Sequence, residues 1–185
     1  IEPIQGYGGV IPLPPGYLTA AARLVRAAGG VLIADEVQTG FGRTGDHYWG
    51  FERDGVLPDA VVMSKGIGNG FPLAAVAMRR DMAESMAQRK FFNSRGSTPM
   101  ACAAGRAVLA VIDDEGLQHN ARVVGDQMGA TLRRLREAHP VIGDVRGHGL
   151  MRGIEFVRDR ATREPAEHEA GGVQVVLARV HVPDV

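Results

Sequence analysis

Two side chains of opposite charge each come after an apolar run in this sequence. Asp35 follows the run VLIA and opens the stretch DEVQTGFGRTG, and Lys65 ends the stretch PDAVVMSK. In α/β sheets, ligands gather outside the carboxyl ends of the strands, because the loops there vary while the sheet holds its position. A carboxylate and an amine that lie 30 positions apart and meet at one such edge could hold a cofactor that needs both.

Pyridoxal phosphate is a cofactor with that requirement. Its aldehyde forms a Schiff base with a lysine amine, and its pyridine nitrogen becomes a better electron sink when a carboxylate keeps it protonated. Lys65 and Lys90 are the only lysines among 21 basic residues, and arginine cannot lose its proton to attack a carbonyl. The alternative is that Asp35 caps a loop and Lys65 is a solvated strand end, and the spacing alone leaves both open.

The pattern of apolar residues predicts the elements that position these groups. Apolar runs separated by helical segments favour an α/β sheet covered on both faces. Near Asp113 the chain is expected to pass from part of a large domain, residues 1–113, to part of a smaller C-terminal domain, residues 114–185. The predicted elements are a helix at 19–29, strands at 31–36, 58–65 and 73–79, helices at 100–116 and 117–139, strands at 141–147 and 149–157, and a last helical stretch after 172.

The composition shows no bias toward a large charged partner. The 185 residues are 45% hydrophobic, which is enough for a core. The 21 basic and 21 acidic residues give a formal net charge of zero, so there is no electrostatic case for nucleic acid or an anionic membrane. We therefore expect a small-molecule partner.

Cysteine and histidine offer no metal site. The single cysteine, Cys102, excludes an internal disulfide framework and is expected in the core of an alanine-rich helix, and the six histidines lack metal-ligand spacing. No apolar run approaches the roughly 20 residues that span a bilayer, and no secretion signal is visible. A reducing, cytoplasmic setting is expected, and a start at Ile1 rather than methionine suggests that preceding sequence has been lost.

The motifs around Asp35 and Lys65 resemble those of a known enzyme family. ADEVQTGFGRTG followed by PDAVVMSKGIGNGFPLAAV is similar to the signature region of the class III (subgroup II) aminotransferases, which are pyridoxal phosphate enzymes of fold type I. IEPIQGYGG and GDVRGHGLMRGIEFV extend the likeness over most of the chain. QGYGGV, SKGIGNGFP and PMACA look most similar to the alanine–glyoxylate type and its phospholyase relatives, which act on amino-alcohol phosphates. The resemblance implies part of the α/β large-domain sheet plus part of the small domain, in a homodimer or dimer of dimers.

The resemblance also assigns roles to individual residues. Lys65 becomes the Schiff-base lysine that later moves a proton, and Asp35 becomes the partner of the pyridinium nitrogen. Val37 would pack against one face of the cofactor ring, and Gln38 would approach its phenolic oxygen. The role of Glu36 stays open, with a structural hydrogen bond beneath the loop as the simpler alternative.

One motif departs from the family pattern. Members carry a phrase like NTFGGNP, whose threonine reaches the cofactor phosphate of the partner subunit, where this chain has NSRGSTP at Asn93–Pro99. Counted back from Pro99, Ser94 takes the threonine position and keeps the hydroxyl. Thr98 lies at the wrong offset for that contact.

Several further residues carry weaker alternatives. Tyr48 and Trp49 could line a substrate entrance or pack in the core. Arg146 and Arg152 flank a glycine-rich turn and are candidates for carboxylate binding.

The resemblance implies transfer of an amino group from an amino acid or amine to a 2-oxo acid such as pyruvate or glyoxylate. The alternatives are a phospholyase acting on an amino-alcohol phosphate and an inactive truncated module. Members of the family are longer, with a phosphate-binding glycine-rich loop before this region and a carboxylate-binding arginine after it. We therefore expect an incomplete chain that cannot form a whole site alone.

Overall fold

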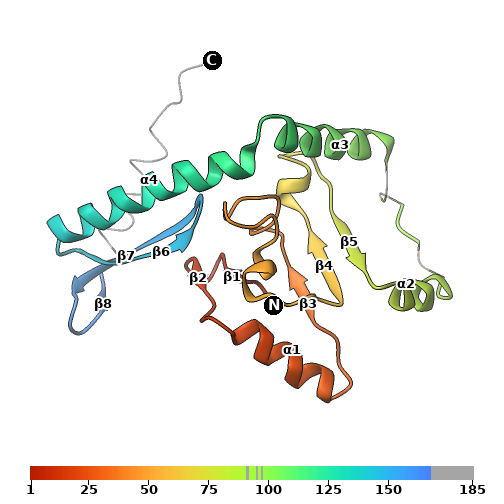
Figure 1. Ribbon diagram of the computed structural model, residues 1–185, viewed down its shortest axis with the longest axis horizontal. Coiled ribbons are helices and arrows are strands. Elements are labelled where there is room, and N and C mark those ends of the chain that lie inside the picture. Colours follow the sequence, from red (N-terminus) through yellow and green to blue (C-terminus); the bar gives the residue numbers. More distant parts are fainter. Residues whose placement is uncertain (91, 95, 97, 168–185) are drawn as a thin grey trace.

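A computed structural model describes residues 1–90, 92–94, 96 and 98–167 of the chain (Figure 1). Its first half contains a three-stranded sheet in the order β3-β4-β5, in which β3 and β4 run parallel and β5 runs antiparallel to β4. Asp35, the last residue of β3, lies opposite Val62 of β4. The strands are β3 (Ile33–Asp35), β4 (Ala60–Met63) and β5 (Ala75–Met78).

Helix α1 (Tyr17–Ala27) covers one face of this sheet because its apolar residues recur at helical spacing. Leu18 is 1% exposed and Ala34 is fully buried beneath it. Asp54, at the end of the short 3₁₀ helix η1 (Gly50–Asp54), accepts a hydrogen bond from the Leu18 amide at 2.9 Å and so caps the first turn of α1. The core residues are Leu18, Ala22, Leu32, Ala34 and Phe51.

The opposite face of the β3-β4-β5 sheet is partly exposed, whereas the sequence predicted a sheet covered on both faces. Ile33 is 43% exposed and Val76 is 52% exposed, and both belong to the side that turns away from Ala34. Within the described residues, the core cluster lies on the α1 side alone.

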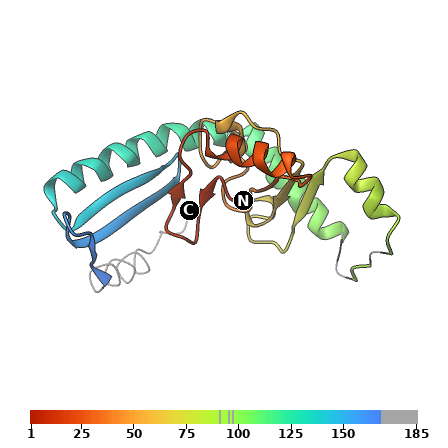
Figure 2. The same ribbon diagram turned by 90° about the horizontal axis from the view of Figure 1, so that it is seen from below.

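The second half is built from two helices and a hairpin. Helix α3 (Pro99–Asp114) and helix α4 (Leu117–Ala138) meet at Gly116, whose φ of 60° turns the chain. Helix α4 lies along the antiparallel hairpin of β6 (Ile142–His148) and β7 (Met151–Asp159), as Figures 1 and 2 show. Strand β8 (Glu164–Pro165) pairs with the far end of β7.

The predicted helices and strands are confirmed within a few residues, but short elements were missed. Strands β1 (Ile4–Gln5) and β2 (Ile11–Pro12) pair inside a segment expected to be a loop, and helix α2 (Arg80–Ala87) follows β5. A two-residue strand is too short to show periodicity. The helical stretch expected after residue 172 lies outside the described residues.

The prediction that Cys102 lies in the core is wrong, because its side chain is exposed. The buried face of α3 is formed by Ala101, Gly105 and Ile112. With 3.6 residues per turn, position 102 is rotated about 100° away from that face. Alanine-rich composition gave no information about which side of the helix would be covered.

No helix within the described ranges combines the length and the apolar character needed to cross a bilayer.

Candidate active site

Asp35 and Lys65 come to the same edge of the sheet. Asp35 ends β3, and Lys65 follows the end of β4 by two residues, as the first residue of the 3₁₀ helix η2 (Lys65–Ile67). Because β3 and β4 are adjacent and parallel, their carboxyl ends point the same way. Both residues therefore lie at the carboxyl-end edge of the sheet, but Asp35 lines neither of the two clefts that border Lys65.

The two adjacent acids have different environments. Asp35 is half-buried, and its Oδ1 accepts a hydrogen bond from the Val37 amide at 3.1 Å. Its Oδ2 accepts none from the part of the chain that the structure describes, so this oxygen is available to a ligand.

Glu36 is fully buried, and its carboxylate bonds to protein donors. Its carboxylate accepts hydrogen bonds from the Thr39 hydroxyl at 2.6 Å and from the Gly50 and Phe51 amides, both at 2.9 Å. Burial raises the pKa of the Glu36 carboxyl, although these three donors oppose the shift. These contacts pin both ends of the loop 36–51 and support the structural alternative for Glu36.

A cleft of about 380 Å³ opens beside Lys65. Val37 and Gln38 also line it, so the structure brings together three residues assigned by the resemblance. A Cβ at Gly6 would overlap the Gln38 amide, which shows that the first segment of the chain closes over Gln38. The full lining is Gly6, Val10, Val37, Gln38, Gly40, Arg43, Lys65, Gly66, Leu150, Met151 and Arg152.

The surroundings of Lys65 are positively charged. A second cleft, of about 470 Å³, also borders Lys65, and Arg43 lines both clefts. Among the described residues, no aspartate or glutamate lines either cleft. Lys65 and Arg43 are exposed, and neither side chain has a hydrogen-bond acceptor within the described ranges. Such a lining favours an anionic ligand.

Ser94 is not part of these clefts. It is exposed in the turn before α3 and lines neither cavity beside Lys65. Thr98 caps α3, accepting a hydrogen bond from the Ala101 amide at 3.3 Å, with Pro99 at the first helical position. The structure thus gives Thr98 a role other than ligand binding.

Arg146 and Arg152, the candidates for carboxylate binding, are committed to protein acceptors. Arg146 bonds to Glu155 at 2.5 Å, to Asp144 at 3.1 Å and to the Gly9 carbonyl at 2.9 Å. These contacts fasten the N-terminal segment to the β6–β7 hairpin.

The Arg152 guanidinium instead donates to three backbone carbonyls. They belong to Gly149 at 3.0 Å, Gly147 at 2.8 Å and Gly125 of α4 at 3.0 Å. This bonding ties the hairpin turn to the helix.

The loop GFGRTG makes a contact that sequence reasoning missed. The Leu150 amide donates to the Arg43 carbonyl at 3.0 Å, and a Cβ at Gly149 would overlap the Thr44 backbone. A Cβ at Gly45 would lie 2.7 Å from Cα of Arg122 in α4. The glycines of GFGRTG and GHGL were the available signal, because backbones approach this closely only where Cβ atoms are absent.

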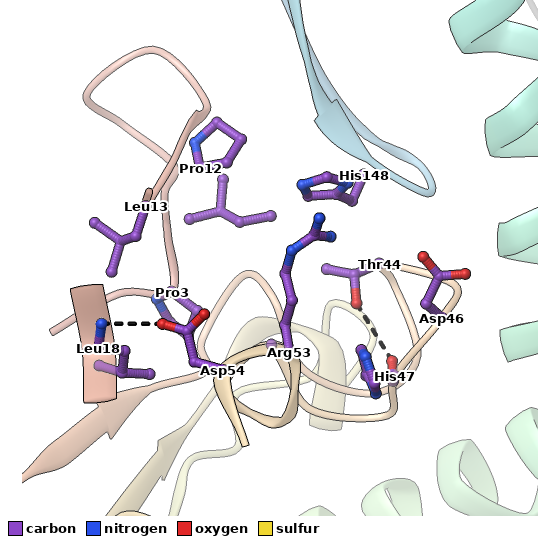
Figure 3. Close-up of a pocket in the computed structure, with 12 residues that line it drawn as sticks. Pro3, Pro12, Leu13, Leu18, Thr44, Asp46, His47, Arg53, Asp54 and His148 are labelled. Carbon is purple, nitrogen blue, oxygen red and sulfur yellow. Dashed lines mark hydrogen bonds between the residues drawn. The ribbon is translucent and has the colours of Figure 1, made fainter. Parts of the chain in front are cut away.

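A small enclosed cavity lies at the same junction but apart from Lys65 (Figure 3). Its volume of about 20 Å³ is room for one water molecule. Arg53 points toward His148 across it. Burial, with Arg53 and Arg152 nearby, lowers the pKa of His148. This cavity belongs to the contact between the hairpin and the N-terminal segment.

Within the described residues, no cluster of histidine, cysteine, aspartate or glutamate could hold a metal ion.

Comparison with known proteins places the chain among related enzymes. The profile of the family described as aminotransferase class-III matches residues 1–182. The human protein named alanine–glyoxylate aminotransferase 2, mitochondrial, is 54% identical over 169 residues, which are 91% of this chain and 33% of that protein. A Caenorhabditis elegans protein named ethanolamine-phosphate phospho-lyase homolog 1 is 46% identical over 96% of this chain and 38% of its own length.

Solved structures of transaminases share the fold of this chain. An amine transaminase from an uncultivated Pseudomonas species, crystallised in its pyridoxal phosphate-bound form, aligns with a TM-score of 0.81 and 40% identity over 92% of this chain and 40% of that one. The chain therefore spans between a third and two fifths of the length of these relatives.

Proposed function

Because this chain belongs to the class-III aminotransferase family, we propose that it is part of a pyridoxal phosphate enzyme that transfers amino groups. The amino donor is an amino acid or amine, and the acceptor is a 2-oxo acid such as pyruvate or glyoxylate. The observation that carries the proposal is that Asp35 and Lys65 lie at the same edge of the sheet, at the ends of adjacent parallel strands, and that Lys65 lines a cleft of about 380 Å³.

The residues at this edge fit the cofactor. An exposed amine and a carboxylate with one free oxygen lie at the same edge of the sheet, and the clefts beside the amine have a positively charged lining, as a phosphate group requires. The cleft volume also suits a ligand of this size. When bound, the cofactor supplies an electron sink for the pair left on the substrate's α carbon.

Each proposed site residue has a separate task. Lys65 would bind the cofactor aldehyde and then move a proton to and from the substrate's α carbon, and Asp35 would keep the ring nitrogen protonated. Val37 would pack against the ring, and the Gln38 amide would donate to the phenolic oxygen.

The proposed assembly rests on the same family pattern. We propose a homodimer in which Ser94 reaches the phosphate bound by the partner subunit. Its exposed position before α3 is compatible with that role. Light scattering of the full-length protein measures the oligomeric state, and a monomer with full activity would exclude this use of Ser94.

The phospholyase alternative keeps the same site and changes the products. It is favoured by the likeness to the ethanolamine-phosphate phospho-lyase homologue. An aminotransferase yields a keto acid and an aminated acceptor, whereas a phospholyase yields an aldehyde, ammonia and inorganic phosphate. Product analysis with alanine and with phosphoethanolamine therefore separates the two.

The site itself is tested by trapping. The full-length protein that carries these residues is mixed with an equimolar amount of pyridoxal phosphate, reduced with borohydride and mapped by mass spectrometry. We expect the pyridoxyl label on Lys65, with Lys90 as the internal reference. Labelling of Lys90 to the same extent, or no label on Lys65, would overturn the proposal. A labelled Lys65 without any turnover would identify an inactive module.

We also propose the domain division at residues 113 and 114, supported by the corner at Gly116, which separates the β3-β4-β5 sheet from the β6-β7-β8 sheet. A cytoplasmic location is proposed from the free, exposed thiol of Cys102, which suits a reducing compartment. Fractionation tests the location, because the human relative is named as mitochondrial.

A further inference from the structure

We propose that Phe41 is a positioning residue for Lys65. Its ring, packed against Gly66, holds the Lys65 backbone in the left-handed conformation that directs the amine into the cleft. The inference rests on the proposed function, in which the Lys65 amine binds the cofactor aldehyde.

Two neighbouring parts of the site have unusual backbone conformations. Lys65 has a φ of 42° and Phe41 a φ of 62°. A residue with a Cβ is disfavoured there, and such residues persist only where the surroundings over-determine them. Outliers of this kind concentrate at functional sites, where the conformation is part of the mechanism.

Hydrogen bonds hold the C-terminal side of Lys65. Its carbonyl accepts from the Gly68 amide at 3.1 Å and from the Asn69 amide at 3.0 Å. These bonds close the turn of η2 but leave Gly66, the next residue, without a backbone hydrogen bond in the described part of the chain.

The Phe41 ring covers Gly66. A Cβ built on Gly66 would lie 3.1 Å from Cδ2 of Phe41, which is tighter than an ordinary contact. The ring therefore lies directly against the residue that follows Lys65, on the side where a side chain of Gly66 would be, and limits the movement of this backbone.

Phe41 is itself supported by packed aromatic rings. Its ring meets Trp49 edge to face at a centroid distance of 5.1 Å and Tyr48 at 6.0 Å. Trp49 in turn stacks parallel to Phe51, whose amide donates to the buried Glu36. Tyr48 and Trp49 thus serve as the support of Phe41, which decides between the two uses that the sequence left open for them.

The test measures attachment of the cofactor, apart from turnover. In the full-length apoprotein, the Lys65 amine condenses with the pyridoxal phosphate aldehyde and releases one water, and absorbance gives the rate. We expect Phe41→Leu to slow this rate about tenfold, because the left-handed conformation is then no longer enforced. Phe41→Tyr keeps the ring and should restore the rate to within about twofold.

The matched control is Val157→Ala, because Val157 is buried in β7, lies outside the aromatic group and does not contact Gly66. It should lower the melting temperature and leave the attachment rate unchanged. The inference is overturned if Phe41→Leu lowers only the melting temperature, or if Val157→Ala slows attachment equally.

Gly66→Ala changes the other partner of the contact between Phe41 and Gly66. It tests the inference on its own if Phe41→Leu does not fold. A tenfold slower attachment supports the inference, and an unchanged rate overturns it. If the unsubstituted protein attaches no cofactor at Lys65, the proposed function itself fails, whereas attachment that is indifferent to Phe41 and Gly66 removes only this inference.

Discussion

The edge around Lys65 and the junction around the β6–β7 hairpin both contain basic side chains, but they use them differently. At the hairpin, Arg146 and Arg152 each bond to three protein acceptors. At the edge, Lys65 and Arg43 are exposed and have no acceptor within the described ranges. Charges that the fold has satisfied stabilise the structure, whereas charges left unpaired in a cleft mark a place for a ligand.

The largest expected effect comes from removing an unpaired charge. Lys65→Ala in the full-length protein should reduce turnover by at least about a thousandfold, because the substitution removes the group that binds the aldehyde and moves the proton. The free energy of unfolding should change by less than about 0.5 kcal/mol, since the Lys65 side chain makes no hydrogen bond in the described part of the chain. Steady-state kinetics and urea unfolding measure the two quantities. If the variant kept its turnover, the unpaired charge of Lys65 would not mark a ligand site, and the contrast with the paired arginines of the hairpin would fail.

Glu36 offers the reverse case, a satisfied charge next to the site. Glu36→Gln should lower the free energy of unfolding by about 3 kcal/mol, because an amide cannot accept the three hydrogen bonds that the buried carboxylate accepts. Glu52→Gln is the control: Glu52 is exposed and accepts one bond, from the Trp49 amide at 2.9 Å. Its cost should stay below about 1 kcal/mol. Equal losses in the two variants would contradict the structural role of Glu36.

Arg152→Lys tests a satisfied charge at the hairpin. An ammonium group cannot reach three carbonyls in the fixed geometry of a guanidinium, so we expect a loss of about 1.5 kcal/mol in the free energy of unfolding. Arg134, on the exposed side of α4, donates only to Thr131 at 3.2 Å, and Arg134→Lys should stay within about 0.5 kcal/mol. Chemical denaturation of both variants measures the difference. If Arg152→Lys cost no more than its control, the three carbonyl contacts would not stabilise the junction.

The smallest expected effect is a pH dependence at the same junction. The pKa of His148 is lowered by burial and by Arg53 and Arg152, so the unfolded chain takes up a proton more readily than the folded one. The stability that neutral His148 contributes is complete above the unfolded pKa of about 6.5 and declines as pH falls toward the lower folded pKa. We expect the melting temperature to drop by about 2 °C between pH 7 and pH 5, and His148→Gln to remove that part of the decline. If the melting temperature of the variant declined with pH just as that of the unsubstituted protein does, protonation of His148 would not contribute to the decline.

Much of the edge could be predicted from the sequence, because strand pattern and motif act locally. Asp35 and Lys65 close two apolar runs, and parallel pairing then brings them together. The structural hydrogen bonds of Glu36 were one of two alternatives at the level of the sequence, and the role of Phe41 could not be predicted at all. Both depend on contacts between the loop 36–51, η1 and η2, which no periodicity encodes.

The exposed face of α3 marks another limit of sequence reasoning. Cys102 was expected in the core because its neighbours are small and apolar. Which side of such a helix is covered depends on tertiary packing, and here the covered side is that of Ala101 and Gly105.

The exposure of Cys102 also makes this chain convenient for optical measurements. These 185 residues contain one cysteine and one tryptophan, so within them a thiol-reactive dye on Cys102 and the indole of Trp49 form a single donor and acceptor pair. Trp49 packs against Phe41, and Cys102 lies on α3. Energy transfer between them would report, in solution and in real time, how far the helix moves relative to the aromatic group.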